Sequence, residues 1–311
     1  MKLYVGVTDN EWFDFLSSHQ PLDEVNFWQP SGESVFRALQ PGELFLFKLH
    51  SPRDYIAGGG FFAYSTILPV SLAWDAFQEK NGAPSYEEMR NKIVRYRRTA
   101  NNRWEDFKIG CILLTQPFFL DESDWFKAPE WSPPIVRGKG YDLDTESGKF
   151  ILKNIEHALI RKKELYLDEA GISLIEEHER YGKGILVKPR LGQGAFKVVV
   201  TDAYNRSCAI TQERALPVLE ASHIKPYSKD GPHDVKNGIL MRSDMHRLFD
   251  TGYMTITPDL NIEVSRRIKE EYENGKYYFT FHGQKLYPPR RLDERPSSEF
   301  LSWHNENVFR G

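Results

Sequence analysis

Two histidines and an asparagine within residues 208–252 have the types and spacing that hydrolysis of a phosphodiester bond would need. His223 is followed by Asn237 fourteen residues later and by His246 after nine more. An imidazole can accept the proton of an attacking water, and an imidazole can also ligate a metal ion. One histidine could therefore activate water while the other holds a metal ion.

The local pattern predicts the elements that position these side chains. The short apolar segment before His223 is typical of a strand. Asn237 and Gly238 are typical of a turn, because both residue types tolerate positive φ. Residues 243–249 predict a short helix, with Ser243 as its N-cap and apolar residues at core-facing spacing. The second histidine would then lie on a helix that packs against the hairpin carrying the first.

Length and composition indicate an ordinary globular protein with two domains. The chain has 311 residues and a net charge of −3, and its two cysteines, Cys111 and Cys208, form neither a disulfide framework nor a CxxC pair. Residues 1–150 carry 16 basic and 21 acidic side chains, against 25 and 23 in the remainder. A partner with a phosphate backbone would therefore meet local basic patches. The sequence shows no signal peptide and no membrane-spanning segment, so we expect an intracellular, cytoplasmic protein.

The order of apolar runs, glycines and prolines predicts an α+β fold with three parts. Residues 1–148 alternate strand-like runs with three predicted helices and form the first domain. Residues 149–187 are expected to be a helical linker, since they follow a Pro- and Gly-rich stretch. Residues 188–311 are expected to form the second domain. Gly58 to Gly60 interrupt one strand and predict a bulge or a close backbone approach.

The segment from Arg190 to Asp259 resembles the HNH endonuclease family, in the branch found at the C-terminus of restriction-type nucleases. The motifs that carry the resemblance are RLGQGAFKVVVTDAYNRSCAIT, LEASHIKPY, KNGILMRSDMHRLFDTG and YMTITPD. The resemblance implies a ββα-metal fold in which His223 is the general base, Asn237 braces the loop and His246 is a metal ligand. It also implies a divalent cation: Mg²⁺ is expected, with Mn²⁺, Ni²⁺ or Zn²⁺ as alternatives.

One position departs from the family's pattern. The residue before the base is commonly an Asp or His that helps to hold the metal, and here it is Ser222, whose neutral hydroxyl is a weak ligand. Asp250 is the leading substitute, because it lies one helical turn after His246 and would share its face. Asp250 could equally just end the helix, and Glu220 is a weaker candidate.

Basic and amide side chains around the motif are candidates for contacts with DNA phosphates, with an ordinary solvated surface as the alternative. In the second domain they are Arg190, Gln193, Lys225, Arg242 and Arg247. In the first domain a predicted helix presents Arg95, Arg97 and Arg98.

The first domain weakly resembles the PUA-like group that includes EVE, ASCH and SRA domains, through NFWQPSG, GELFLFKLHSP, IAGGGFF and SLAWDAFQEKNGA. The resemblance implies a β-barrel or sheet that holds a flipped, modified base in an aromatic pocket. The candidate pocket residues are Phe27, Trp28, Tyr64 and Trp104; the alternative is that most of them belong to the core.

Taken together, these features predict a modification-dependent, type IV-like restriction endonuclease. It would recognise modified cytosine in double-stranded DNA with residues 1–148 and cut with the HNH site. Two alternatives stay open: an HNH restriction endonuclease specific for an unmodified sequence, and a DNA-binding protein whose nuclease site has decayed, which Ser222 favours. Cleavage of both strands with one site per chain favours a homodimer.

Overall fold

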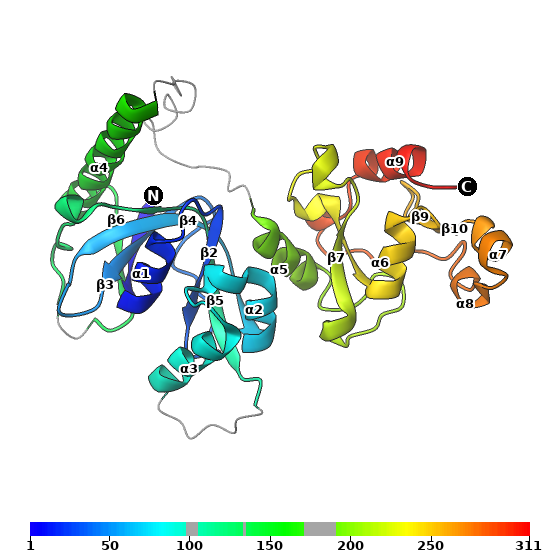
Figure 1. The fold of residues 1–311 in the computed structure, drawn as a ribbon, viewed down its shortest axis with the longest axis horizontal. Helices are drawn as coiled ribbons and strands as arrows, with labels where there is room; N and C mark the ends of the chain where they lie inside the picture. Colours follow the sequence, from blue (N-terminus) through cyan, green and yellow to red (C-terminus); the bar gives the residue numbers. More distant parts are fainter. Residues whose placement is uncertain (98–104, 133–134, 171–190) are drawn as a thin grey trace. The chain divides into compact units, whose positions relative to one another are not determined.

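The computed structural model of the protein describes residues 1–97, 105–132, 135–170 and 191–311, and the chain divides into two compact units, Met1–Pro189 and Arg190–Gly311 (Figure 1). Each unit combines helices and strands, as the α+β prediction requires. No helix among the described residues is both long and apolar enough to cross a membrane.

The first unit is built on a six-stranded mixed sheet. Its order is β2-β5-β4-β3-β1-β6, in which β1 and β3 run parallel and every other neighbouring pair runs antiparallel. The strands are β1 (Lys2–Thr8), β2 (Glu24–Gln29), β3 (Leu44–Leu49), β4 (Ile56–Pro69), β5 (Lys108–Phe119) and β6 (Gly138–Asp142). The register between β4 and β5 shifts between Gly59 and Phe61, so the glycine run lies at a bulge, as its sequence indicates.

Within the described part of this unit, four α-helices accompany the sheet: α1 (Asn10–Ser17), α2 (Val70–Phe77), α3 (Tyr86–Arg97) and α4 (Glu146–Ala170), with 3₁₀ helices at Gln78–Asn81 and Glu122–Asp124. Helix α1 begins where the Asp9 carboxylate accepts a hydrogen bond from the Trp12 backbone N–H at 2.7 Å, and it buries Trp12, Phe13 and Leu16. Asp9 therefore fixes the start of the helix that brings Trp12 to the sheet.

Helix α4 packs against the sheet of the first unit. Its apolar side chains Ile151, Ile155 and Ala158 are buried together with Leu3 and Leu46 from the strands. The first unit therefore extends past residue 148, where the sequence suggested a boundary, because the helix expected to be a linker contributes to this core.

The second unit contains a hairpin followed directly by a helix. Strand β7 (Leu219–His223) pairs antiparallel with β8 (Gly238–Arg242), and α6 (Ser243–Asp250) begins at the next residue and lies against both strands (Figure 1). The remaining elements are α5 (Gln193–Ala203), β9 (Met254–Ile256), β10 (Ile262–Val264), α7 (Arg267–Tyr272), α8 (Lys276–Phe279) and α9 (Ser298–Asn307). Four 3₁₀ helices lie at Leu216–Val218, Tyr227–Lys229, Val235–Asn237 and Leu292–Glu294.

The start of β8 differs from the sequence prediction. Asn237 ends a 3₁₀ helix, and Gly238 is extended, with φ −124° and ψ 142°, so the expected positive-φ turn is wrong. Gly238 is needed for space instead, because an added Cβ would collide with the side chains of Val200 and Phe196 on α5. Ser243 is also not the N-cap: the cap position is Arg242, without a side-chain hydrogen bond, and Ser243 is the first helical residue.

Candidate active site

A cavity of about 650 Å³ in the second unit collects the chemically active side chains of the ββα segment. His223 from β7 and His246 and Asp250 from α6 line it, together with Glu220 from β7. The other lining residues are Gln193, Phe196, Lys197, Ala221, Ile224, Pro226, Tyr227, His304 and Val308. Two histidines that are 23 positions apart in the sequence therefore face one space.

His223 is held in a fixed orientation by two aromatic neighbours. Its ring stacks on Phe196, with centroids 3.9 Å apart and an interplanar angle of 13°. Its Nε2 lies 2.9 Å from Nδ1 of His233. Burial lowers the pKa of His223 to about 4, and the neighbouring His233 and His246 act in the same direction. The imidazole is therefore neutral at physiological pH, as a proton acceptor must be.

His246 is paired with a carboxylate at each ring nitrogen. Its Nδ1 lies 2.6 Å from an oxygen of Glu220, and its Nε2 lies 3.2 Å from an oxygen of Asp250, four residues later on the same helix. Burial by itself would lower the pKa of His246, but the hydrogen bonds and charges of Asp250 and Glu220 outweigh it and raise that pKa. The pKa values of His246 and His223 are thus shifted in opposite directions.

Asn237 is fully buried beneath the loop that joins the two strands of the hairpin. Its side-chain oxygen accepts a hydrogen bond from the Lys225 backbone N–H, and its amide group donates to the carbonyls of Lys225 and Pro232, each at 2.9 Å. These three hydrogen bonds tie the start and the middle of the loop to the side chain at its end.

Ser222 does not lie on the cavity. Its side chain is fully buried, and its hydroxyl contacts the carbonyl oxygen of His223 at 3.4 Å. Side chains two residues apart on a strand share a face, and on this face the longer Glu220 extends to His246. The carboxylates beside His246 are therefore Glu220 and Asp250.

The donor atoms suit a divalent cation that keeps most of its own water. No three or more His, Cys, Asp or Glu side chains converge on one point within the described residues. Mg²⁺ is commonly bound through one or two carboxylates plus waters; Asp250 would offer one such carboxylate, and Nε2 of His246 would be a nitrogen ligand beside it. A histidine that ligates a metal usually bonds a carboxylate through its other nitrogen, and Glu220 occupies that place.

The candidate phosphate contacts of the second unit are distributed unevenly. Gln193 lines the cavity, whereas Lys225, Arg242 and Arg247 do not. The Arg242 guanidinium is engaged by Asp244 through two hydrogen bonds of 2.6 Å, and it also donates to the Tyr277 hydroxyl at 3.1 Å. Arg247 is exposed, and Lys225 lies 5.8 Å from the ring of Trp303. Arg190 lies outside the described residues.

Sequence reasoning missed His233 and Tyr227. Both belong to the loop between β7 and β8, where residues follow no helical or strand periodicity. A third histidine ten positions after His223 was a visible signal, but only the folded loop places it beside the other ring.

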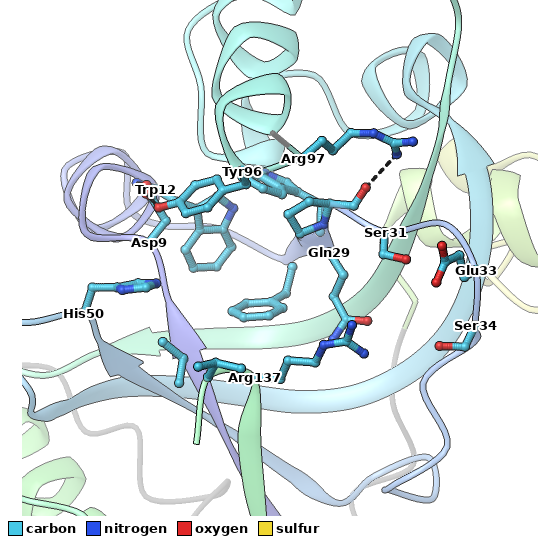
Figure 2. A pocket seen from close by; sticks show the side chains of 15 residues that line it. Asp9, Trp12, Gln29, Ser31, Glu33, Ser34, His50, Tyr96, Arg97 and Arg137 are labelled. Atoms are coloured by element: carbon cyan, nitrogen blue, oxygen red, sulfur yellow. Dashed lines mark hydrogen bonds between the residues drawn. The ribbon is translucent and has the colours of Figure 1, made fainter. Parts of the chain in front are cut away.

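A second cavity, of about 490 Å³, lies in the first unit (Figure 2). Phe27 and Trp28 of β2 line it, each only 8% exposed, so they serve both the core and the cavity. Tyr64 is not among its lining residues, and Trp104 lies outside the described part of the chain. The complete lining is Val7, Asp9, Trp12, Phe27, Trp28, Gln29, Pro30, Ser31, Glu33, Ser34, His50, Tyr96, Arg97, Val136 and Arg137.

Polar contacts made by two residues of α3 hold the wall of this cavity. Asp9, which caps α1, also accepts a hydrogen bond of 2.5 Å from the hydroxyl of Tyr96 on α3, and burial together with this carboxylate raises the pKa of Tyr96. Arg97 donates to the carbonyl of Pro30 at 2.8 Å (Figure 2) and to that of Lys108 at 2.9 Å, so its guanidinium anchors the cavity rim. Arg95 is exposed, and Arg98 lies outside the described residues.

Part of the second unit matches the model of a known protein family. Residues 208–257 match the model of the HNH endonuclease family. The matched segment contains β7, β8 and α6, with His223, Asn237 and His246 in it. None of the curated proteins matches the chain.

Among solved structures, the chain is similar to the ASCH protein of Zymomonas mobilis. That structure shares 12% sequence identity, with a TM-score of 0.32, and the match covers 49% of this chain and 94% of that one. Two point mutants of the same protein match with 12% identity and TM-scores of 0.32 and 0.29. This similarity is too low to indicate a function for the first unit, so its function is inferred from its own residues.

Proposed function

We propose that the protein is a modification-dependent, restriction-type DNA endonuclease, in which the HNH segment cuts and the first unit reads a modified cytosine. The observation that carries the nuclease role is the shared cavity of His223, His246 and Asp250 within the segment that matches the HNH endonuclease family. A half-buried, neutral imidazole and a cation-binding pair in one space are the two parts that metal-assisted hydrolysis requires.

The chemistry assigned to each side chain follows from its surroundings. His223 would remove a proton from a water molecule that attacks the phosphorus atom, because its low pKa keeps it unprotonated. His246 and Asp250 would hold the divalent cation, which supplies charge to neutralise the oxygens of the phosphate as the bond breaks. Glu220 would hold the His246 ring in orientation through Nδ1. Asn237 would keep the loop beside His223 in place.

The reader role is supported by the cavity of the first unit. Its volume falls within the roughly 300–1,000 Å³ of small-molecule sites, and its wall combines aromatic rings with Asp9, Gln29 and Glu33. Extruding a base costs a few kcal/mol, which stacking on aromatic side chains and hydrogen bonds to the base edge would offset. We assign modified cytosine as the base and a homodimer as the species that cuts both strands.

A plasmid digest tests this proposal. Supercoiled plasmid with and without cytosine modification is incubated with the protein and Mg²⁺, Mn²⁺, Ni²⁺ or Zn²⁺, and nicked and linear products are measured. We expect metal-dependent cutting of the modified plasmid only. Equal cutting of both plasmids would remove the reader role and favour an enzyme specific for unmodified DNA, and no cutting with any ion would favour a decayed site.

The variant His223→Ala tests the assignment of the base. Loss of a general base lowers rates by roughly 10²- to 10⁴-fold, and we expect DNA binding in a gel-shift assay to be unchanged. Full cleavage activity in this variant would refute the role of His223.

A further inference from the structure

His233 makes the closest polar contact of the His223 ring. The two imidazoles meet at 2.9 Å between Nε2 of His223 and Nδ1 of His233, with ring centroids 5.0 Å apart. Two neutral imidazoles can share only one proton in such a contact, so one nitrogen donates and the other accepts. The direction of this hydrogen bond decides which nitrogen of His223 is left with a free lone pair.

The loop places His233 at a fixed position. Its ring stacks on Tyr227, with centroids 4.6 Å apart and an interplanar angle of 9°. The residue before it, Pro232, is held through its carbonyl by the buried Asn237 side chain at 2.9 Å. His233 is therefore constrained on one side by stacking and on the other by the backbone that Asn237 anchors.

We propose that His233 is a positioning residue that accepts the Nε2–H of His223 and so leaves Nδ1 of His223 as the atom that takes the proton from water. If His233 were the donor instead, Nε2 would be occupied and Nδ1 would carry the remaining proton, and His223 could accept nothing. A partner that fixes the tautomer of a catalytic imidazole is a known device of hydrolytic sites. The inference rests on the proposed nuclease function, and it adds that Asn237 acts on His223 through Pro232 and His233.

Three variants of one position separate this role from packing. His233→Asn places an amide oxygen where Nδ1 stands and can still accept the hydrogen bond, His233→Gln carries its amide one bond further out, and His233→Phe keeps a ring for Tyr227 without any acceptor. In steady-state cleavage with saturating Mg²⁺ we expect kcat to fall by roughly 10- to 100-fold in the Phe and Gln variants. The Asn variant is expected to retain most of kcat, with KM little changed in all three. Equal rates in all three variants would overturn the proposal.

The tautomer itself can be read without any cleavage. In the full chain with ¹⁵N-labelled histidine, we expect the His223 signals of a protonated Nε2 and an unprotonated Nδ1, and a mixture of tautomers in His233→Phe. A protonated Nδ1 in the wild-type protein would refute the inference even if the enzyme cuts DNA. If the wild-type protein cuts nothing but shows the expected tautomer, the proposed function fails and the positioning contact stands.

Discussion

The low pKa of His223 predicts that the rate of cleavage depends only weakly on pH between neutrality and pH 5.5. An imidazole with the ordinary pKa of 6.5 is only about 10% neutral at pH 5.5, whereas one with a pKa of about 4 is roughly 97% neutral. We therefore expect the contribution of His223 to kcat/KM to change by less than about twofold between pH 7.5 and pH 5.5. An exposed histidine in the same role would lose about tenfold over that interval.

The assay must separate His223 from His246, whose pKa is shifted upward by Asp250 and Glu220. We suggest initial rates of plasmid nicking at constant ionic strength, because phosphate contacts depend on salt, with kcat/KM reporting the free enzyme. Protons compete with the metal for His246, so a loss of activity caused by that residue moves to lower pH as Mg²⁺ is raised. A loss caused by His223 does not move. A midpoint near pH 6.5 that stays fixed as Mg²⁺ is raised would refute the reasoning.

A substitution of Phe196, whose ring stacks on His223, gives the matched control. Burial is the largest cause of the low His223 pKa, and Phe196 covers one face of the imidazole at 3.9 Å. Phe196→Leu keeps an apolar side chain but uncovers part of that face. The acid midpoint should therefore rise toward 6.5, and an unchanged midpoint would show that burial by Phe196 does not set the pKa.

Further predictions concern the metal pair, the loop and the reader cavity. Glu220→Gln should raise the Mg²⁺ concentration for half-maximal cleavage by roughly 10- to 100-fold, because the orienting carboxylate of His246 is lost; an unchanged Mg²⁺ dependence would contradict this. Asn237→Ala removes three hydrogen bonds and should destabilise the second unit by roughly 2–4 kcal/mol, measured by urea unfolding followed through hydrogen exchange of that unit. Tyr96→Ala should weaken binding of modified DNA by about 1–3 kcal/mol if the ring stacks on the base, while Tyr55→Ala, an exposed aromatic outside the cavity, should not; equal losses would count against the reader role.

Local sequence patterns were enough to predict the hairpin and helix of the second unit. The apolar spacing of Met245 and Phe249 places both in the core and turns His246 toward β7. The Asn–Gly pair misled for a physical reason: Gly238 is required by its contact with Val200, 38 positions earlier, and no local pattern reports that contact.

The cavity of the first unit also depends on contacts between distant residues, which local sequence patterns do not predict. Phe27 and Trp28 were proposed from the resemblance to base-binding domains, and both line the cavity. Trp12 and Tyr96 were missed because they come from two helices, α1 and α3, that are joined at Asp9 only in the folded chain. The domain boundary near 148 was placed on composition, which cannot tell a charged helix that packs on a sheet from one that connects two domains.

The decayed-site alternative depended on Ser222, and the geometry of β7 weakens it. In the sequence, a serine before the base reads as a missing metal ligand. In the structure Ser222 is fully buried, where a carboxylate would carry a large desolvation cost unless it were paired. Glu220 stands two residues earlier on the same face of the strand, and its longer side chain reaches Nδ1 of His246 while Asp250 meets Nε2. The Asp or His that the family's pattern commonly has at position 222 is therefore replaced by two carboxylates beside His246. Glu220 lies two residues earlier on β7, and Asp250 lies one helical turn later on α6.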